Sequence, residues 1–361
     1  MCRERRSDRT CMRHPVTMLS LATATPPHIL DQAVALEISR DVLGESFGDF
    51  ERMASVFETA GIQTRQLACP PDWYRTPRDF TEKTAAYLAA ADDLFVEVAG
   101  KALAAAGLAA ADVDTIVTVS TTGIATPSLE ARAMRRMDFR QNVARVPVFG
   151  LGCAGGVTGL GLAAKLAGAT PGSIVLFVTI ELCSLTLRTR GTGKADIIST
   201  ALFGDGAGAC ILKVGDEGFA EVSASAEKTW PDTLDIMGWE IEAGGFGVVL
   251  NRAIPAFARR NMRAAMDEML GPQNLRVEAV DRFICHPGGA KVVDALELAL
   301  SLHQGSLDHE RATLRDHGNM SAPTALFVLD RVRADALPPV SVLTALGPGF
   351  TASTVTLKRA A

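Results

Sequence analysis

The chain has 361 residues and lacks any apolar run as long as the roughly 18 residues that a membrane-spanning helix needs. Aromatic residues make up only 6% of it, and positive charge is in deficit: 36 Lys and Arg stand against 41 Asp and Glu, for a formal net charge of -5. No domain-scale basic stripe is present either. We therefore expect no transmembrane segment and no nucleic-acid partner.

Cysteine is present but forms no recognisable framework. The seven cysteines are odd in number and irregularly spaced, and neither CxxC nor a His-x-x-x-His cluster occurs. This pattern argues against a metal site or a disulfide scaffold and favours a reducing, cytoplasmic location. Residues 1–15 contain five arginines but no apolar segment of a signal peptide follows them, so they are predicted to form a disordered leader.

With 48% hydrophobic and 21% charged residues, the remainder resembles a well-packed α/β protein. Two segments, 95–123 and 257–289, share one plan: an amphipathic helix, a turn, a β-branched strand and glycines. A second pair, "ALFGDGAGACILK" and "ALGPGFTASTVTLK", repeats in the same order. We interpret this as a duplicated α/β unit, with halves 16–218 and 219–361. Among the helices expected are 155–169 and 254–270.

One thiol lies where a strand gives way to a helix. Cys153 follows "RVPVFGL" and precedes "GGVTGLGLAAKLA", and a helix N-terminus stabilises a thiolate through its dipole and unpaired N–H groups. We expect the glycines Gly152, Gly155 and Gly156 to leave room for a tight turn and a close-lying substrate. Cys153 is therefore a candidate nucleophile, the alternative being a small buried thiol at a packed elbow.

A nucleophilic cysteine needs a histidine and an orienting or donating group brought to it by the fold. His286 ends the apolar strand "DRFIC" and opens the turn "HPGG", at the strand end that matches Ser120–Thr122 of the first half. Asn319 precedes the apolar helix of "HGNMSAPTALFVLD", where its amide can donate to an oxyanion. The alternatives are a core histidine and a helix-capping asparagine.

The motifs "GLGCAGG", "ALFGDGAGA", "ICHPGG", "GNMSAP" and "GPGFT", in this order, resemble the type III polyketide synthases, the chalcone-synthase-like family of thiolase fold. The resemblance covers nearly the whole chain from residue 16. It implies a homodimer of layered αβαβα subunits and a catalytic triad of Cys153, His286 and Asn319. It also implies repeated decarboxylative condensation of malonyl-CoA onto an acyl starter, supplied by CoA or a carrier protein, without a metal or redox cofactor.

The resemblance further implies a substrate pocket. Phe203 matches an aromatic gatekeeper, Val248 stands where the family has a second phenylalanine and so widens the cavity, and Arg65 aligns with an arginine that contacts CoA. The other pocket positions implied are Thr121, Thr122, Thr126, Cys183, Thr186, Ser321, Leu346, Gly347, Pro348 and Gly349.

The phrases "VTIELCSL" and "PDTLDIMGWEIEAGGFGVV" look most like the bacterial branch that makes long-chain alkylresorcinols and alkylpyrones, which implies a fatty-acyl starter. Within the same fold, an initiating β-ketoacyl synthase is an alternative, although its motif after the histidine differs from "HPGG". Thiolases need a second cysteine in the C-terminal glycine loop, and the corresponding segment "ALGPGFT" has none. The glutamate motif of hydroxymethylglutaryl-CoA synthases is also missing. Other classes left open are a papain-like hydrolase, which the duplication disfavours, and a non-catalytic acyl-binding protein of this fold.

Overall fold

The computed structural model describes residues 15–44, 50–188, 193–242 and 245–360. The predicted leader, residues 1–15, lies outside this part of the chain except for its last residue.

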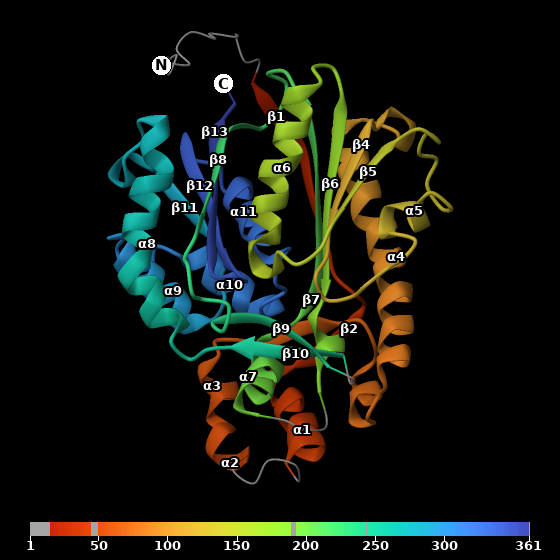
Figure 1. Ribbon diagram of the computed structural model, residues 1–361, viewed down its shortest axis with the longest axis vertical. Coiled ribbons are helices and arrows are strands. Elements are labelled where there is room, and N and C mark those ends of the chain that lie inside the picture. The colour runs from red at the N-terminus through yellow and green to blue at the C-terminus, as the bar shows by residue number, and fades with distance from the viewer. Residues whose placement is uncertain (1–14, 45–49, 189–192, 243–244, 361) are drawn as a thin grey trace, which may run out of the picture.

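A nine-stranded mixed sheet runs through the molecule (Figure 1). Two small antiparallel sheets stand apart from it: β9 (Met237–Glu242) with β10 (Gly245–Leu250), and β2 (His28–Asp31) with β3 (Thr64–Leu67). In spatial order the large sheet contains β11 (Arg282–Cys285), β12 (Val340–Gly347), β13 (Thr351–Arg359), β8 (Ala220–Thr229), β1 (Val16–Ala24), β7 (Asp205–Val214), β6 (Ile174–Leu182), β4 (Thr115–Val119) and β5 (Ala144–Val148).

The order of the strands confirms the predicted duplication. In the N-terminal half, β4 runs parallel to β6, which is antiparallel to β7, which is antiparallel to β1. In the C-terminal half, β11, β12, β13 and β8 repeat these pairings in the same order. The halves join where β1 meets β8 through only two paired positions, Thr17↔Glu221 and Met18↔Ala220. The sheet is therefore two similar sheets joined edge to edge, as in a thiolase-like α/β fold.

Helices cover the faces of both half-sheets (Figure 1). The predicted helices 155–169 and 254–270 have the expected bounds, whereas α10 forms in a charged stretch for which no helix was expected. None of the helices in the described ranges is long and apolar enough to cross a membrane. The helices are α1 (Gln32–Leu43), α2 (Phe50–Met53), α3 (Ser55–Thr59), α4 (Phe80–Ala106), α5 (Leu129–Ala133), α6 (Gly155–Ala169), α7 (Lys194–Leu202), α8 (Ile254–Leu270), α9 (Ala290–Ala299), α10 (Asp308–His317) and α11 (Thr324–Ala334).

The start of α6 lies directly against the chain that leads into α11. A Cβ atom on Gly156 would lie 2.1 Å from the carbonyl oxygen of Ala322, and one on Gly155 would lie 2.7 Å from Cγ1 of Val119. Both distances are far below a van der Waals contact. Only glycine therefore allows the N-terminus of α6 to come this close to the segment before α11.

Replacing Gly156 by alanine tests this contact. Both Gly156→Ala and the control Gly100→Ala gain about 1 kcal/mol of helix propensity, but Gly100, inside α4, has no atom within 4 Å of an added Cβ. We expect Gly156→Ala to lower the free energy of unfolding by about 1–3 kcal/mol, as overpacked sites do, while Gly100→Ala leaves it equal or higher. Denaturant titration measures both, and equal stabilities for the two variants would contradict the proposed close approach.

Candidate active site

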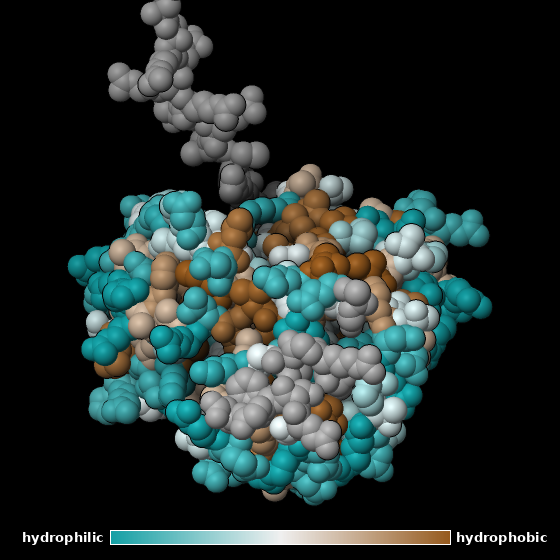
Figure 2. All heavy atoms as spheres, turned by 60° about the horizontal axis from the view of Figure 1, so that its bottom comes forward, coloured by the Kyte–Doolittle hydropathy of each residue, from teal (hydrophilic) through white to brown (hydrophobic). Residues whose placement is uncertain are grey.

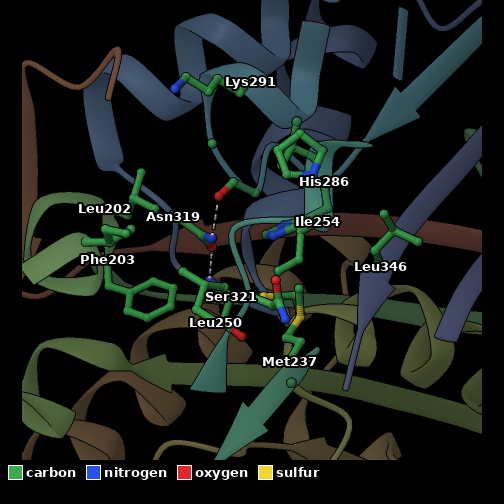
Figure 3. Close-up of a pocket in the computed structure, with 18 of the residues that line it drawn as sticks. Leu202, Phe203, Met237, Leu250, Ile254, His286, Lys291, Asn319, Ser321 and Leu346 are labelled. Carbon is green, nitrogen blue, oxygen red and sulfur yellow. Dashed lines mark hydrogen bonds between the residues drawn. The ribbon is translucent and has the colours of Figure 1, made fainter. Parts of the chain in front are cut away.

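A cavity of about 270 Å³ opens between the two halves and the β9–β10 hairpin. Its walls are mostly apolar, and its polar lining side chains include those of Cys153, His286 and Asn319. In Figure 3, Leu202 and Phe203 lie on one side of Asn319 and His286, and Leu346 lies on the other. The three residues singled out as candidate catalytic groups therefore share one apolar cavity.

Cys153 is held on a tight turn at the start of α6. β5 ends at Val148, Gly152 adopts a left-handed φ of +48°, and a short 3₁₀ turn, Gly152–Ala154, leads into the helix. The backbone N–H of Gly152 donates to Oγ1 of Thr121 at 3.1 Å, which fixes the turn from behind. The expected tight turn is confirmed. The expected room for substrate at Gly155 and Gly156 is wrong, because Val119 and the backbone of Ala322 fill it.

The side-chain amide of Asn319 is fixed at both ends. Its Oδ1 accepts from the N–H of Ser321 at 2.8 Å, and its Nδ2 donates to the carbonyl of Gly288 at 3.2 Å (Figure 3). Its backbone pairs with that of Phe203 in an isolated parallel bridge. Ser321 has a left-handed φ of +57°, an uncommon conformation for a residue other than glycine. The bond to Gly288 uses one of the two Nδ2 hydrogens, so the other can donate to the Cys153 thiolate or to a ligand in the cavity.

His286 follows β11 and is 4% exposed. Its backbone N–H donates to the carbonyl of Thr344 at 2.8 Å, which extends the β11–β12 pairing by one residue. Within the described ranges neither Nδ1 nor Nε2 has a hydrogen-bond partner. A buried imidazole that lines a cavity with both nitrogens unpaired can bond to a substrate there.

Burial favours the uncharged forms of both groups. It raises the pKa of the Cys153 thiol to about 11, although hydrogen bonds from Ser321 and Asn319 favour the thiolate. It lowers the pKa of the His286 imidazole to about 4. A separate charge on either group is therefore unfavourable in the cavity. Passing a proton from Cys153 to His286 creates the two opposite charges together and leaves the net charge of the cavity unchanged.

A buried carboxyl group lies behind the nucleophile. Glu181, at the end of β6, is 0% exposed and accepts hydrogen bonds from the backbone N–H groups of Thr121 and Thr122 and from the hydroxyl of Thr122. Burial raises its pKa to about 7 despite these bonds. Its negative charge raises the pKa of Cys153. The protonation state of Glu181 therefore affects how readily the thiolate forms.

Most of the predicted pocket residues lie together, and some do not. Thr121 and Thr122 are buried beneath the cavity against Glu181, Thr126 lies exposed on the surface, and Thr186 lines a second, smaller cavity. Gly347 packs against Ala154 and Gly349 lies in the adjoining turn, so neither lines the cavity itself. The predicted residues that do line it are Cys153, Cys183, Phe203, Val248, His286, Asn319, Ser321, Leu346 and Pro348.

The expectation that Arg65 contacts CoA is wrong. Its side chain is 1% exposed, and its guanidinium donates to the carbonyl of Ala201 at 3.1 Å, to that of Phe203 at 3.1 Å and to the side chain of Gln32. Burial lowers its pKa to about 10. Arg65 therefore holds the end of α7 in the interior, where CoA cannot reach it. An arginine in a polar sequence gives no sign of such burial.

Several cavity residues were missed in the sequence. Lys291 and Arg252 are exposed basic residues in the lining, and Trp239 pairs directly across the hairpin with Val248. The indole therefore occupies space beside the position where a small residue was expected to widen the cavity. Two glycines between alternating apolar runs, at 244–245, are a hairpin signal, but a two-residue turn at these positions would pair Trp239 with Leu250. The register that places Trp239 beside Val248 therefore comes from the structure alone.

Comparison with known proteins identifies the family to which this chain belongs. The model of the chalcone and stilbene synthase N-terminal domain matches residues 3–216, and that of the C-terminal domain matches residues 221–360. A 1,3,6,8-tetrahydroxynaphthalene synthase of Streptomyces peucetius subsp. caesius is 38% identical over 97% of this chain and 94% of its own length. A 3,5-dihydroxyphenylacetyl-CoA synthase of Streptomyces toyocaensis is 28% identical over 93% of this chain and 90% of its own.

A solved structure agrees with these matches. The crystal structure of 1,3,6,8-tetrahydroxynaphthalene synthase from Streptomyces coelicolor A3(2), a bacterial type III polyketide synthase, superposes with a TM-score of 0.90 at 26% identity. The superposition covers 96% of this chain and 99% of that one.

The influence of Glu181 on Cys153 can be measured. Removing the carboxylate charge with Glu181→Gln takes away one cause of the raised thiol pKa. We therefore expect the pH profile of Cys153 alkylation by iodoacetamide to move to lower pH, by on the order of one unit. The rate is followed by mass spectrometry of the peptide that contains Cys153.

Glu310→Gln is the matched control. Glu310 is another buried carboxyl group whose pKa is raised to about 7, but it lies in α10, bonded to Arg282 and to the backbone of Cys285. Its replacement should leave the alkylation profile in place. An unchanged profile in Glu181→Gln would show that its charge does not act on Cys153.

Proposed function

Because this chain belongs to the chalcone and stilbene synthase family and is a type III polyketide synthase, an acyltransferase, we propose that it extends a long-chain fatty-acyl starter held on Cys153. Repeated condensation with malonyl-CoA and ring closure then yield an alkylresorcinol or an alkylpyrone. One observation carries the chemistry: the buried imidazole of His286, which has no hydrogen-bond partner among the described residues, shares an apolar cavity with Cys153 and with the oriented amide of Asn319.

In the first step Cys153 receives the starter. Its Sγ attacks the carbonyl carbon of the acyl thioester while its proton passes to His286, and CoA leaves as a thiol after taking that proton. The acyl group is then bonded to Cys153. Both residues return to uncharged forms, which their burial favours.

In the second step malonyl-CoA loses CO2 and becomes an enolate. The negative charge develops on its thioester oxygen, where the protonated ring nitrogen of His286 and the free N–H of Asn319 donate hydrogen bonds. Neither group adds a negative charge that would oppose the enolate. The enolate carbon attacks the acyl group on Cys153, a carbon–carbon bond forms, and the Cys153 thiolate leaves. CoA thioesters suffice for these steps, so we expect no metal or redox cofactor.

The lining of the cavity supports an acyl starter. Beyond the polar groups its walls include Ile254, Met262 and Leu296, and burial of apolar chain length is favourable at about 0.8 kcal/mol per CH₂. A smaller cavity of about 50 Å³ adjoins it and shares Cys183 and Phe203 with it. On the face turned forward in Figure 2, hydrophobic residues gather in the upper and central part and are surrounded by hydrophilic ones. The exposed Lys291 and Arg252 are the residues that we expect to meet the phosphates of CoA.

The large sheet supports pairing of two copies. β5 is an edge strand with β4 as its neighbour, and the adjoining Phe149 and Ile124 are each 50% exposed. An exposed edge with apolar neighbours is a template for association. A homodimer is therefore part of the proposal. The proposal also includes the cytoplasmic location expected from the cysteine pattern, and a starter that arrives on CoA or on a carrier protein.

A second candidate is a small polyhydroxylated aromatic product without an alkyl chain. The name of the relative with 38% identity supports it. Trp239 supports it as well, because its indole occupies space in the cavity wall beside Val248, its partner on the neighbouring strand. The two candidates differ in whether an acyl-CoA enters the product.

Mass spectrometry of the products distinguishes the two candidates. Purified protein is incubated with malonyl-CoA, alone or with hexanoyl-, dodecanoyl- or stearoyl-CoA. We expect products that contain the longer acyl chains, and none from Cys153→Ala, because that variant has no nucleophile. Cys210→Ala is the matched control, since Cys210 lies in the core strand β7. A product from malonyl-CoA alone, with no acyl-CoA incorporated, would favour the second candidate. Product formation by Cys153→Ala would overturn the nucleophile assignment.

A second variant tests the wall of the cavity. Val248→Phe adds volume opposite Trp239, so we expect kcat/KM for stearoyl-CoA to fall about tenfold relative to that for hexanoyl-CoA, the effect of a few methylenes in an apolar pocket. The thermal midpoint of unfolding checks that the variant folds. An unchanged preference would remove Val248 from the surface that the starter contacts.

A further inference from the structure

One face of the β9–β10 hairpin is apolar from end to end. The register pairs Met237 with Leu250, Trp239 with Val248, and Ile241 with Phe246. The first two pairs line the cavity, whereas Phe246 lies farther along the hairpin and is absent from the lining. The same face therefore continues from the cavity to an aromatic ring outside its lining.

Aromatic rings connect this outer position to the cavity. The ring of Phe246 is 5% exposed and lies 6.2 Å from the indole of Trp239 between centroids. On its other side it meets Phe80 edge to face at 5.8 Å and Phe149 at 6.4 Å. Trp239 in turn lies 6.4 Å from Phe203, the aromatic residue bridged to Asn319. Phe246 therefore lies between two partly exposed rings outside the cavity and the indole inside it.

At the cavity end the hairpin is attached by Met237 and Leu250, which pack against the core cluster of the C-terminal half. It is an isolated two-stranded sheet, and such sheets are marginally stable without side-chain packing. Near its tip, Nη1 of Arg188 donates to both carboxylate oxygens of Glu242 at 2.8 Å, on the face opposite Trp239. The ion pair holds the hairpin, but it does not contact the indole. Among the described aromatic residues, Phe246 and Phe203 are the rings that contact it on the apolar face.

We infer that Phe246 is a positioning residue for starter selection: it holds the Trp239 indole against Phe203 and thereby limits the length of acyl chain that the cavity accepts. Without the Phe246 ring, the indole can move away from Phe203 into the vacated space. The cavity then gains room at this wall. The statement about chain length rests on the proposed function, whereas the statement about the indole does not.

The position of the indole is tested by fluorescence. The chain has three tryptophans, so Trp73→Phe with Trp230→Phe leaves Trp239 as the single emitter. In this background we expect Phe246→Ala to increase acrylamide quenching of Trp239 about twofold and Phe246→Leu to increase it less. Phe257→Ala is the matched control, because Phe257 belongs to a separate cluster with Phe350. Equal quenching with and without the Phe246 ring would overturn the inference, whatever the enzyme's substrates are.

The effect on selection is tested with the three acyl-CoAs and a double-mutant cycle. We expect Phe246→Ala and Trp239→Ala each to raise the ratio of kcat/KM for stearoyl-CoA to that for hexanoyl-CoA, by about tenfold. Because Phe246 acts through the indole, the double variant should match Trp239→Ala alone. Additive effects, or an equal loss for every starter in Phe246→Ala, would contradict the inference. If the wild type extends no acyl-CoA, the proposed function fails, and quenching alone then decides the role of Phe246.

Discussion

The active site depends on the close approach of two backbones. The N-terminus of α6 carries Cys153, and the chain before α11 carries Asn319 and Ser321. The two segments meet where Gly156 faces the carbonyl of Ala322, at a distance that leaves no room for a side chain. Each segment belongs to a different half of the duplicated fold, so this contact brings the Cys153 thiol of one half and the Asn319 amide of the other to the same cavity.

Around this contact, burial disfavours the charged forms of the titratable groups. The cavity contains a thiol and an imidazole that burial keeps uncharged, and the carboxyl group behind them has a pKa raised to about 7. Such a site can generate opposite charges by one proton transfer, and in the proposed reaction its amide and imidazole donors add no negative charge of their own beside the enolate. The basic side chains Lys291 and Arg252 lie at exposed positions of the lining, where CoA phosphates would remain in contact with water.

Local patterns predicted much of the fold. The helices 155–169 and 254–270 have the expected bounds, because their apolar spacing is continuous and glycine or proline marks their ends. The duplication was visible as repeated motifs and reappears as repeated strand pairings. The predictions from sequence were wrong at positions where the burial of a residue determines what it contacts. Arg65 was expected to contact CoA but is buried, and Gly156 was expected to make room for substrate but makes room for Ala322.

The sequence by itself determined the fold class, the family and the three candidate catalytic residues, because strand ends, helix starts and ordered motifs are local in the chain. Only the tertiary structure decided which implied pocket residues line the cavity, that Glu181 lies behind the nucleophile and that Trp239 stands opposite Val248. These relations join residues far apart in the chain or across a hairpin register. They are set by which surfaces pack together, and a linear pattern does not record that packing.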